Sequence, residues 1–143
     1  FFASIERHLF RVNGGFVVLS YWRDQPVAGA VFLCRGQHAI YKYGASNLAF
    51  QSLRANNLVM WEAIRWLARK GFATLSFGRT SGRNDGLRRF KLGWGTSEYP
   101  ISYQKFDYEK NRFVADADDA YGWHNAIFSR LPIWLSRLAG AFL

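Results

Sequence analysis

The sequence has few cysteines and no long apolar runs. Only one cysteine occurs in 143 residues, and no apolar run approaches the 18 or so residues of a membrane-spanning helix. A lone Cys34 cannot form an internal disulfide, so we expect a small buried side chain and a reducing setting. These absences favour a cytoplasmic chain, with peripheral contact at the inner face of the membrane as an alternative.

The usual patterns of metal and nucleophile chemistry are also missing. The three histidines lie far apart, and none has a Cys or His partner at the spacing of a zinc site. Asp116, Asp118 and Asp119 lack the glycine and terminal glutamate of a calcium loop, which favours N-capping of a following helix. No dinucleotide fingerprint or phosphate loop occurs. The sequence therefore predicts no metal site.

What the chain does contain is apolar and basic. Half of the residues are hydrophobic and 18% are aromatic, which indicates a globular fold with a real core. Nineteen Lys and Arg against ten Asp and Glu give a formal charge of +9. Such a charge favours polyanions, including cofactor phosphates, RNA and an anionic membrane surface. Charge alone does not choose among them.

Hydrophobic periodicity predicts alternating strands and helices. We expect a leading helix over 1–11, a hairpin of strands 15–22 and 26–33, and a third strand over 37–43. The two hairpin strands are almost continuously apolar, so both faces of their sheet should be covered. The longest helix should run over 53–70 with a core stripe of Leu53, Met60, Ile64, Leu67 and Ala68. A strand over 73–78, a helix over 84–92 and a strand over 97–107 complete an α/β (α+β) fold with a mixed central sheet.

The stretch 72–95 is the natural place for chemistry, because a strand there leads through a glycine-rich basic loop into a short helix. Asn84 and Asp85 have the character of a helix N-cap and first turn. Phe90 is expected in the core, and Lys91 is expected beside it with an exposed ammonium group. The alternative is an ordinary connection whose arginines are solvated.

Five blocks in order resemble one known family. These are YKYGAS at 41–46, the helix at 54–71, LSFGRTS at 75–81, GLRRFKLGWG at 86–95 and YPISY at 99–103. Together they resemble the second half of Fem-type (FemAB-like) peptidyltransferases, which are built from GNAT acyltransferase domains. The resemblance implies that 1–143 is a single GNAT-like domain, one half of a longer two-domain protein. We expect a C-terminal helical extension over 109–143.

The resemblance also implies site residues. Lys91 matches the lysine of the family's Phe-Lys pair at the transfer site, where a cation stabilises developing negative charge. An acyl-CoA donor would run along the strand at 39–44, and its pyrophosphate would meet the N-terminus of the next helix. The donor-binding candidates are Gly44, Arg54, Ala55, Asn56 and Asn57. The acceptor-binding candidates are Arg79, Ser81, Arg88 and Phe90.

Two tyrosines are further candidates from their chemistry. Tyr41 and Tyr43 are two residues apart in a strand and should share one face, where either hydroxyl could protonate a leaving group. Packing is the alternative for both.

Together these features predict an N-acyltransferase that moves an acyl group from acyl-CoA, such as acetyl-CoA, to an amine-bearing small molecule or cell-envelope precursor. One alternative is an aminoacyl-tRNA donor, which the basic charge suits. Another is a non-catalytic scaffold that docks a partner GNAT-like domain, a second copy in a homodimer, or a membrane through 129–143. That segment places Leu131, Leu135, Leu138 and Phe142 on one helical face, which would equally suit packing on the domain's own core.

Overall fold

The structure is a computed structural model that describes residues 2–114. The chain divides into two compact units between Arg79 and Thr80, and each unit is described by itself. The acidic cluster at 116–119 and the amphipathic segment 129–143 lie outside the described residues. Within residues 2–114, no helix has both the length and the apolar character needed to cross a membrane.

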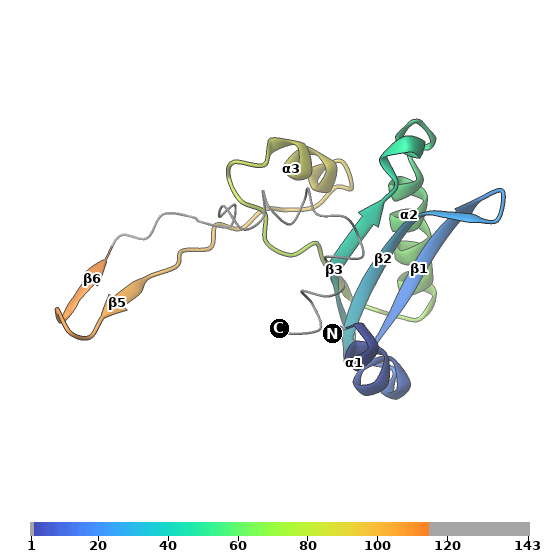
Figure 1. The fold of residues 1–143 in the computed structure, drawn as a ribbon. Coiled ribbons are helices and arrows are strands. Elements are labelled where there is room, and N and C mark those ends of the chain that lie inside the picture. Colours follow the sequence, from blue (N-terminus) through green and yellow to red (C-terminus); the bar gives the residue numbers. More distant parts are fainter. Residues whose placement is uncertain (1, 115–143) are drawn as a thin grey trace. The chain divides into compact units, whose positions relative to one another are not determined.

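A four-stranded sheet forms the centre of the first unit (Figure 1). The strands are β1 (Gly15–Trp22), β2 (Gln25–Arg35), β3 (His38–Ser46) and β4 (Thr74–Ser76), paired in that order. The first three are antiparallel, and β4 runs parallel to β3. The helical elements are α1 (Phe2–His8), η1 (Phe10–Val12), η2 (Leu48–Leu53) and α2 (Ala55–Arg69). The predicted mixed sheet is confirmed.

The turn between β1 and β2 is a tight one. Trp22 pairs with Gln25, and the two residues between them, Arg23 and Asp24, both have positive φ, 47° and 64°. This is the type I′ geometry whose twist matches that of the flanking strands. The hairpin expected from the apolar runs is therefore confirmed.

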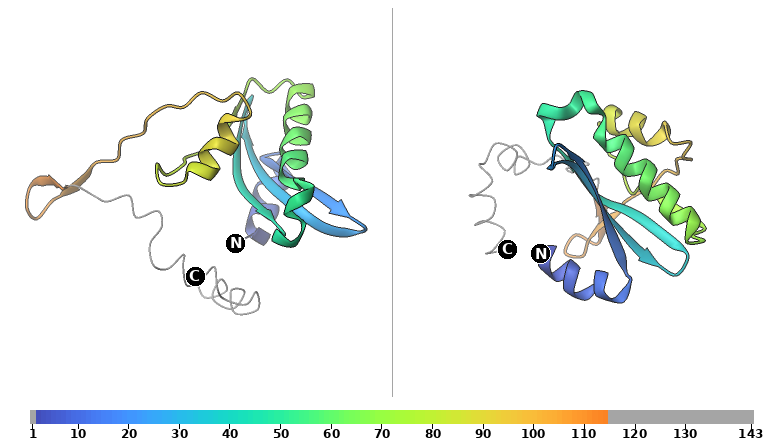
Figure 2. Two further views of the ribbon diagram at one scale, coloured as in Figure 1. Left: turned by 90° about the horizontal axis from the view of Figure 1, so that it is seen from above. Right: turned by 90° about the vertical axis from the view of Figure 1, so that its right-hand side faces the viewer.

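Helices lie on both sides of the sheet. The right-hand view of Figure 2 shows α1 and α2 on opposite sides of the strands. The buried face of α2 consists of Ala55, Val59, Met60, Ala63 and Leu67. Small alanines in this stripe let the helix backbone approach the sheet closely.

The predicted stripe of α2 was only partly right. Met60 and Leu67 are buried as expected, but Ile64 is half-buried and Ala68 is exposed. Leu53 is 43% exposed because it lies in η2, before α2 begins. The spacing of large apolar residues alone thus set the wrong helix start.

Stacked aromatic rings join α2 to the sheet. Phe32 on β2 has no exposed surface, and its ring centroid lies 4.9 Å from that of Phe16 and 5.6 Å from that of Tyr41. Phe16 in turn lies 4.3 Å from Trp66 on α2. The core of this unit is therefore centred on Phe32.

The second unit contains α3 (Asp85–Leu92) and a hairpin of β5 (Lys105–Asp107) and β6 (Arg112–Val114). The predicted strand over 97–107 is wrong apart from its last three residues. Tyr99, Ile101 and Tyr103 alternate as strand residues do, yet they are 82%, 62% and 70% exposed. Residues 109–114 form a turn and β6, so this part of the expected helical extension is not helical.

Candidate active site

A β-bulge in β3 separates the two candidate tyrosines. Val31 pairs with Tyr43 and Phe32 pairs with Tyr41, which leaves Lys42 as the extra residue. Directly opposed residues share a face of the sheet. Tyr41 therefore lies on the face that α2 covers, and Tyr43 lies on the other face. The prediction that both share one face was wrong, because one inserted residue reverses the alternation of side chains.

Tyr41 is a packing residue. Its ring lies against Phe32 and 6.2 Å from that of Phe77, and burial raises the pKa of its hydroxyl. The same ring covers Gly44, where an added Cβ would lie 2.8 Å from the Tyr41 Cζ atom. A side chain at position 44 would therefore clash with the Tyr41 ring, so this position needs glycine independently of any role in donor binding.

Strands β3 and β4 pair only briefly. Their parallel ladder consists of three pairs and ends where Ile40 meets Ser76, although β3 continues to Ser46. The chain leaves β4 through Gly78, which has a φ of 68° and donates its N–H to the Ser76 Oγ atom at 3.2 Å. In the described part of the first unit, the outer half of β3 therefore has no strand paired on the β4 side.

The outer end of β3 is tied to the start of α2. Asn56 Nδ2 donates a hydrogen bond to the Ser46 Oγ atom at 3.1 Å. Arg54 precedes the helix in a left-handed conformation with φ 50°, and the first turn contains no acidic residue. Ala55 is buried, whereas Asn56 and Asn57 are exposed. Four of the predicted donor residues therefore lie at one helix N-terminus, where the helix dipole favours an anion, whereas Gly44 lies on β3.

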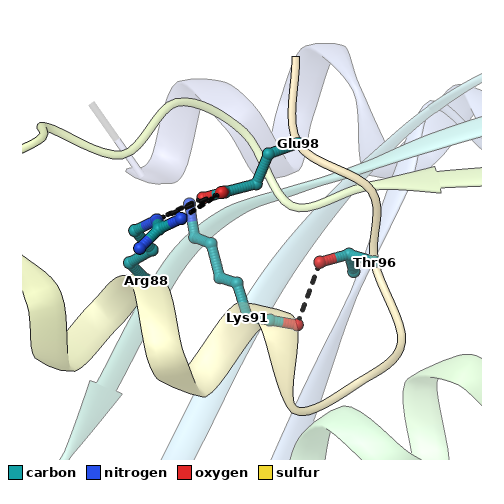
Figure 3. A network of polar contacts seen from close by, with 4 residues as sticks. All are labelled: Arg88, Lys91, Thr96 and Glu98. Atoms are coloured by element: carbon teal, nitrogen blue, oxygen red, sulfur yellow. Dashed lines mark hydrogen bonds and ion pairs between the residues drawn. The ribbon is translucent and has the colours of Figure 1, made fainter. Parts of the chain in front are cut away.

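In the second unit, α3 begins as predicted. The Asn84 side chain accepts the N–H of Leu87 at 3.0 Å, which is an N-cap bond. Arg88 forms a two-pronged ion pair with Glu98, with Nε–Oε1 at 2.8 Å and Nη2–Oε2 at 2.7 Å (Figure 3). This pair raises the pKa of Arg88 and lowers that of Glu98. The Arg88 guanidinium is thus already engaged by a carboxylate.

Lys91 is buried, contrary to the expectation of an exposed ammonium. The residue is 8% exposed, and burial lowers the pKa of its amine. Its backbone carbonyl accepts a hydrogen bond from the Thr96 hydroxyl at 3.1 Å (Figure 3). Phe90 is only half-buried, with its ring 6.4 Å from that of Trp94. Lys91 lies one helical turn after the half-buried Leu87, so the two share the inner face of α3.

The remaining acceptor candidates lie on the connection between the two units. Arg79 is the exposed last residue of the first unit. Ser81, in the second unit, is half-buried, and its hydroxyl oxygen accepts the N–H of Arg83 at 3.4 Å.

Sequence reasoning missed an apolar groove on the sheet face opposite α2. It has a volume of about 490 Å³ and is lined by side chains from three strands, including Val17, Leu19, Val31, Tyr43 and Ala45. Val17 and Leu19 are 44% and 52% exposed, so the expectation that both faces were covered is wrong at this place. A signal was available in the sequence, because small residues gather in β2 at 28–30 and in β3 at 44–46.

Residues 2–114 hold no group of three or more His, Cys, Asp or Glu side chains able to bind a metal ion. Cys34 is half-buried rather than buried, and desolvation raises the pKa of its thiol.

Comparison with known proteins finds solved structures with a similar fold. Among solved structures, one similar chain is an aminoglycoside acetyltransferase, meta-AAC0020, from an uncultured soil metagenomic sample in complex with sisomicin. It is 15% identical, with a TM-score of 0.59 over 69% of each chain. Another is the aminoglycoside N-acetyltransferase AAC(6′)-Iy in complex with CoA, 13% identical, with a TM-score of 0.58 over 72% of this chain and 84% of that one.

At these identities the structures show a shared fold. No match was found among the curated proteins. The sequence model of the acetyltransferase (GNAT) domain matches residues 1–100. This match covers more than half of the chain, and its range includes β3, the start of α2 and Lys91. The chain therefore belongs to the GNAT acetyltransferase domain family.

Proposed function

We propose that this chain transfers an acyl group from acyl-CoA to an amine. The observation that carries the proposal is the end of the β3–β4 ladder after three residue pairs, together with the N-terminus of α2, which follows β3 after the short helix η2. An extended pantetheine arm can lie along β3 beyond Ile40, where the ladder with β4 has ended. One structural neighbour was solved with CoA, which supports this class of donor.

The N-terminal turn of α2 suits the pyrophosphate of the donor. It has no acidic residue and no side chain that caps its N–H groups, and Arg54 stands at its start. Asn56 and Asn57 are exposed beside it. Phosphates bind at such helix ends because the N–H groups and the helix dipole both favour negative charge.

Tyr43 is the residue we assign to proton transfer. Acyl transfer releases a thiolate, which needs a proton as the C–S bond breaks, and a tyrosine hydroxyl can supply it. Tyr43 lines the apolar groove, whereas Tyr41 is packed under α2. We assign Lys91 to electrostatic stabilisation of the developing negative charge, as the Fem-type resemblance implies.

The test is acyl transfer by the full chain with acetyl-CoA and a panel of primary amines that includes sisomicin, followed through release of the free thiol. Tyr43→Phe should lower kcat by about 10² to 10⁴, the usual contribution of general acid catalysis. Tyr108→Phe is the control, because Tyr108 is 88% exposed in the β5–β6 hairpin. Wild-type turnover in a folded Tyr43→Phe protein would remove Tyr43 from the mechanism.

A second candidate is the Fem-type reaction, in which the donor is an aminoacyl-tRNA and the acceptor is a cell-envelope precursor. The formal charge of +9 favours it, since RNA binding depends on many phosphate contacts. The two donors differ in salt dependence. RNA should lose affinity steeply between low and physiological salt, whereas a single CoA should lose little.

A further inference from the structure

We propose that the groove on the sheet face opposite α2 binds the hydrocarbon chain of the donor, so that the preferred substrate is a medium-chain acyl-CoA rather than acetyl-CoA. This inference rests on the proposed function.

The groove crosses three strands in register. Tyr43 on β3 pairs with Val31 on β2, which pairs with Val17 on β1. The neighbouring row is Ala45, Gly29 and Leu19. Adjacent strands lie about 4.8 Å apart, so each row is roughly 9.5 Å long from β3 to β1. This length fits an extended chain of several methylene groups.

Leu19 forms one wall of the groove. An added Cβ on Gly29 would lie 2.6 Å from the Leu19 Cδ2 atom, so the leucine side chain leans over the glycine. Leu19 is nevertheless 52% exposed and Val17 is 44% exposed. Neighbouring exposed aliphatic side chains of this size gain free energy when an apolar ligand covers them.

The lining also argues against a charged occupant. None of the groove residues is charged, and the polar ones, Ser46 and Asn47, lie at the end nearest α2. A polycationic amine would lose hydration in this groove and gain no carboxylate partner. A hydrocarbon chain loses no hydrogen bonds there.

The groove includes Tyr43, and this position indicates that it holds the acyl chain of the donor rather than the amine acceptor. The acyl carbon is bonded to the sulfur that Tyr43 would protonate, so the acyl chain begins beside Tyr43. From there the open direction along the lining is toward Val31 and Val17. The amine acceptor is a separate molecule, so no bond to the sulfur ties its position to the groove.

The experiment measures the dissociation constants of acetyl-, butyryl-, hexanoyl- and octanoyl-CoA for the full chain by titration calorimetry. Partial burial of each methylene in an open groove should strengthen binding about twofold, so octanoyl-CoA should bind on the order of 50-fold tighter than acetyl-CoA. The ratio kcat/KM should follow the same order in the transfer assay.

Two leucines provide a matched pair of variants. Leu19→Gln should reduce the increase in affinity from acetyl-CoA to octanoyl-CoA several-fold, because it places an amide in the groove wall. Leu58→Gln should leave that gain unchanged, since Leu58 is 53% exposed like Leu19 but lies on α2. The ratio of the dissociation constants of two CoA esters cancels any effect of a variant on binding of the shared CoA moiety.

The outcomes separate this inference from the function on which it rests. Equal affinities for acetyl- and octanoyl-CoA would overturn the groove assignment alone. The same would follow if both leucine variants reduced the ratio of the two dissociation constants equally. Absence of binding by every CoA ester would overturn the proposed donor and the groove assignment together.

Discussion

Replacing Phe32 with alanine tests whether the sheet and α2 share one core. Phe32 has no exposed surface and packs between the rings of Phe16 and Tyr41, at 4.9 and 5.6 Å. Truncation removes the whole ring and leaves a cavity under α2, which usually costs about 3 to 5 kcal/mol. Two aromatic contacts of about 0.5 to 1.5 kcal/mol each are lost with it, so we expect a cost near the upper half of that range. This is a large part of the roughly 5 to 15 kcal/mol that stabilises a typical domain.

The assays are urea unfolding and thermal unfolding of the full chain, both followed by tryptophan fluorescence. A cost of about 4 kcal/mol should lower Tm by roughly 8 to 16 °C in a chain of this size. Phe113→Ala is the control, since Phe113 is 67% exposed on β6, and it should cost less than about 1 kcal/mol. If Phe32→Ala gives insoluble protein, Phe32→Leu should still be measurable and cost about 1.5 kcal/mol. Equal costs for the alanine variants of Phe32 and Phe113 would refute the described core.

Two further predictions concern Lys91 and Gly44. Burial lowers the pKa of Lys91 in the folded chain below its ordinary 10.5, so the unfolded chain binds this proton more tightly. In the wild type, the free energy of unfolding should therefore rise with pH from that lowered pKa up to about pH 10.5. Lys91→Met should lack this rise. Urea midpoints that change with alkaline pH in the same way in both proteins would contradict the prediction. Gly44→Ala should cost about 1 to 3 kcal/mol, because its Cβ would displace the Tyr41 ring, and less in a Tyr41→Ala background. Gly82→Ala, where an added Cβ has open space, should be close to neutral, and equal costs at the two glycines would refute the argument.

Much of the first unit was predictable because its signals are local. The two almost continuously apolar runs 15–22 and 26–33 are enough to predict the hairpin, and β1 and β2 confirm it. Asn84 was predicted as a cap because its amide suits the first N–H groups of a helix, and its bond to Leu87 confirms that.

The failures have a common cause, which is that they depend on partners elsewhere in the chain. The bulge at Lys42 exists only in the register of β3 against β2, so the spacing of Tyr41 and Tyr43 could not reveal it. The residues 97–104 alternate like a strand but have no sheet to join within the described part of the second unit. The burial of Lys91 likewise comes from tertiary packing, which overrides the preference of lysine for water.

The short parallel ladder between β3 and β4 also bears on how the first unit folds. The hairpin contacts of β1, β2 and β3 join residues close in sequence, whereas His38 and its β4 partner, Thr74, are separated in the sequence by the whole of α2. Loop closure makes such a distant pairing slow, and a ladder of three pairs holds it weakly. We expect β4 to dock last in folding and to open first in the native state, which amide hydrogen exchange at Leu75 and Ser76 would report. Local unfolding would then begin next to the part of β3 that we propose for the donor, and a bound acyl-CoA would slow it.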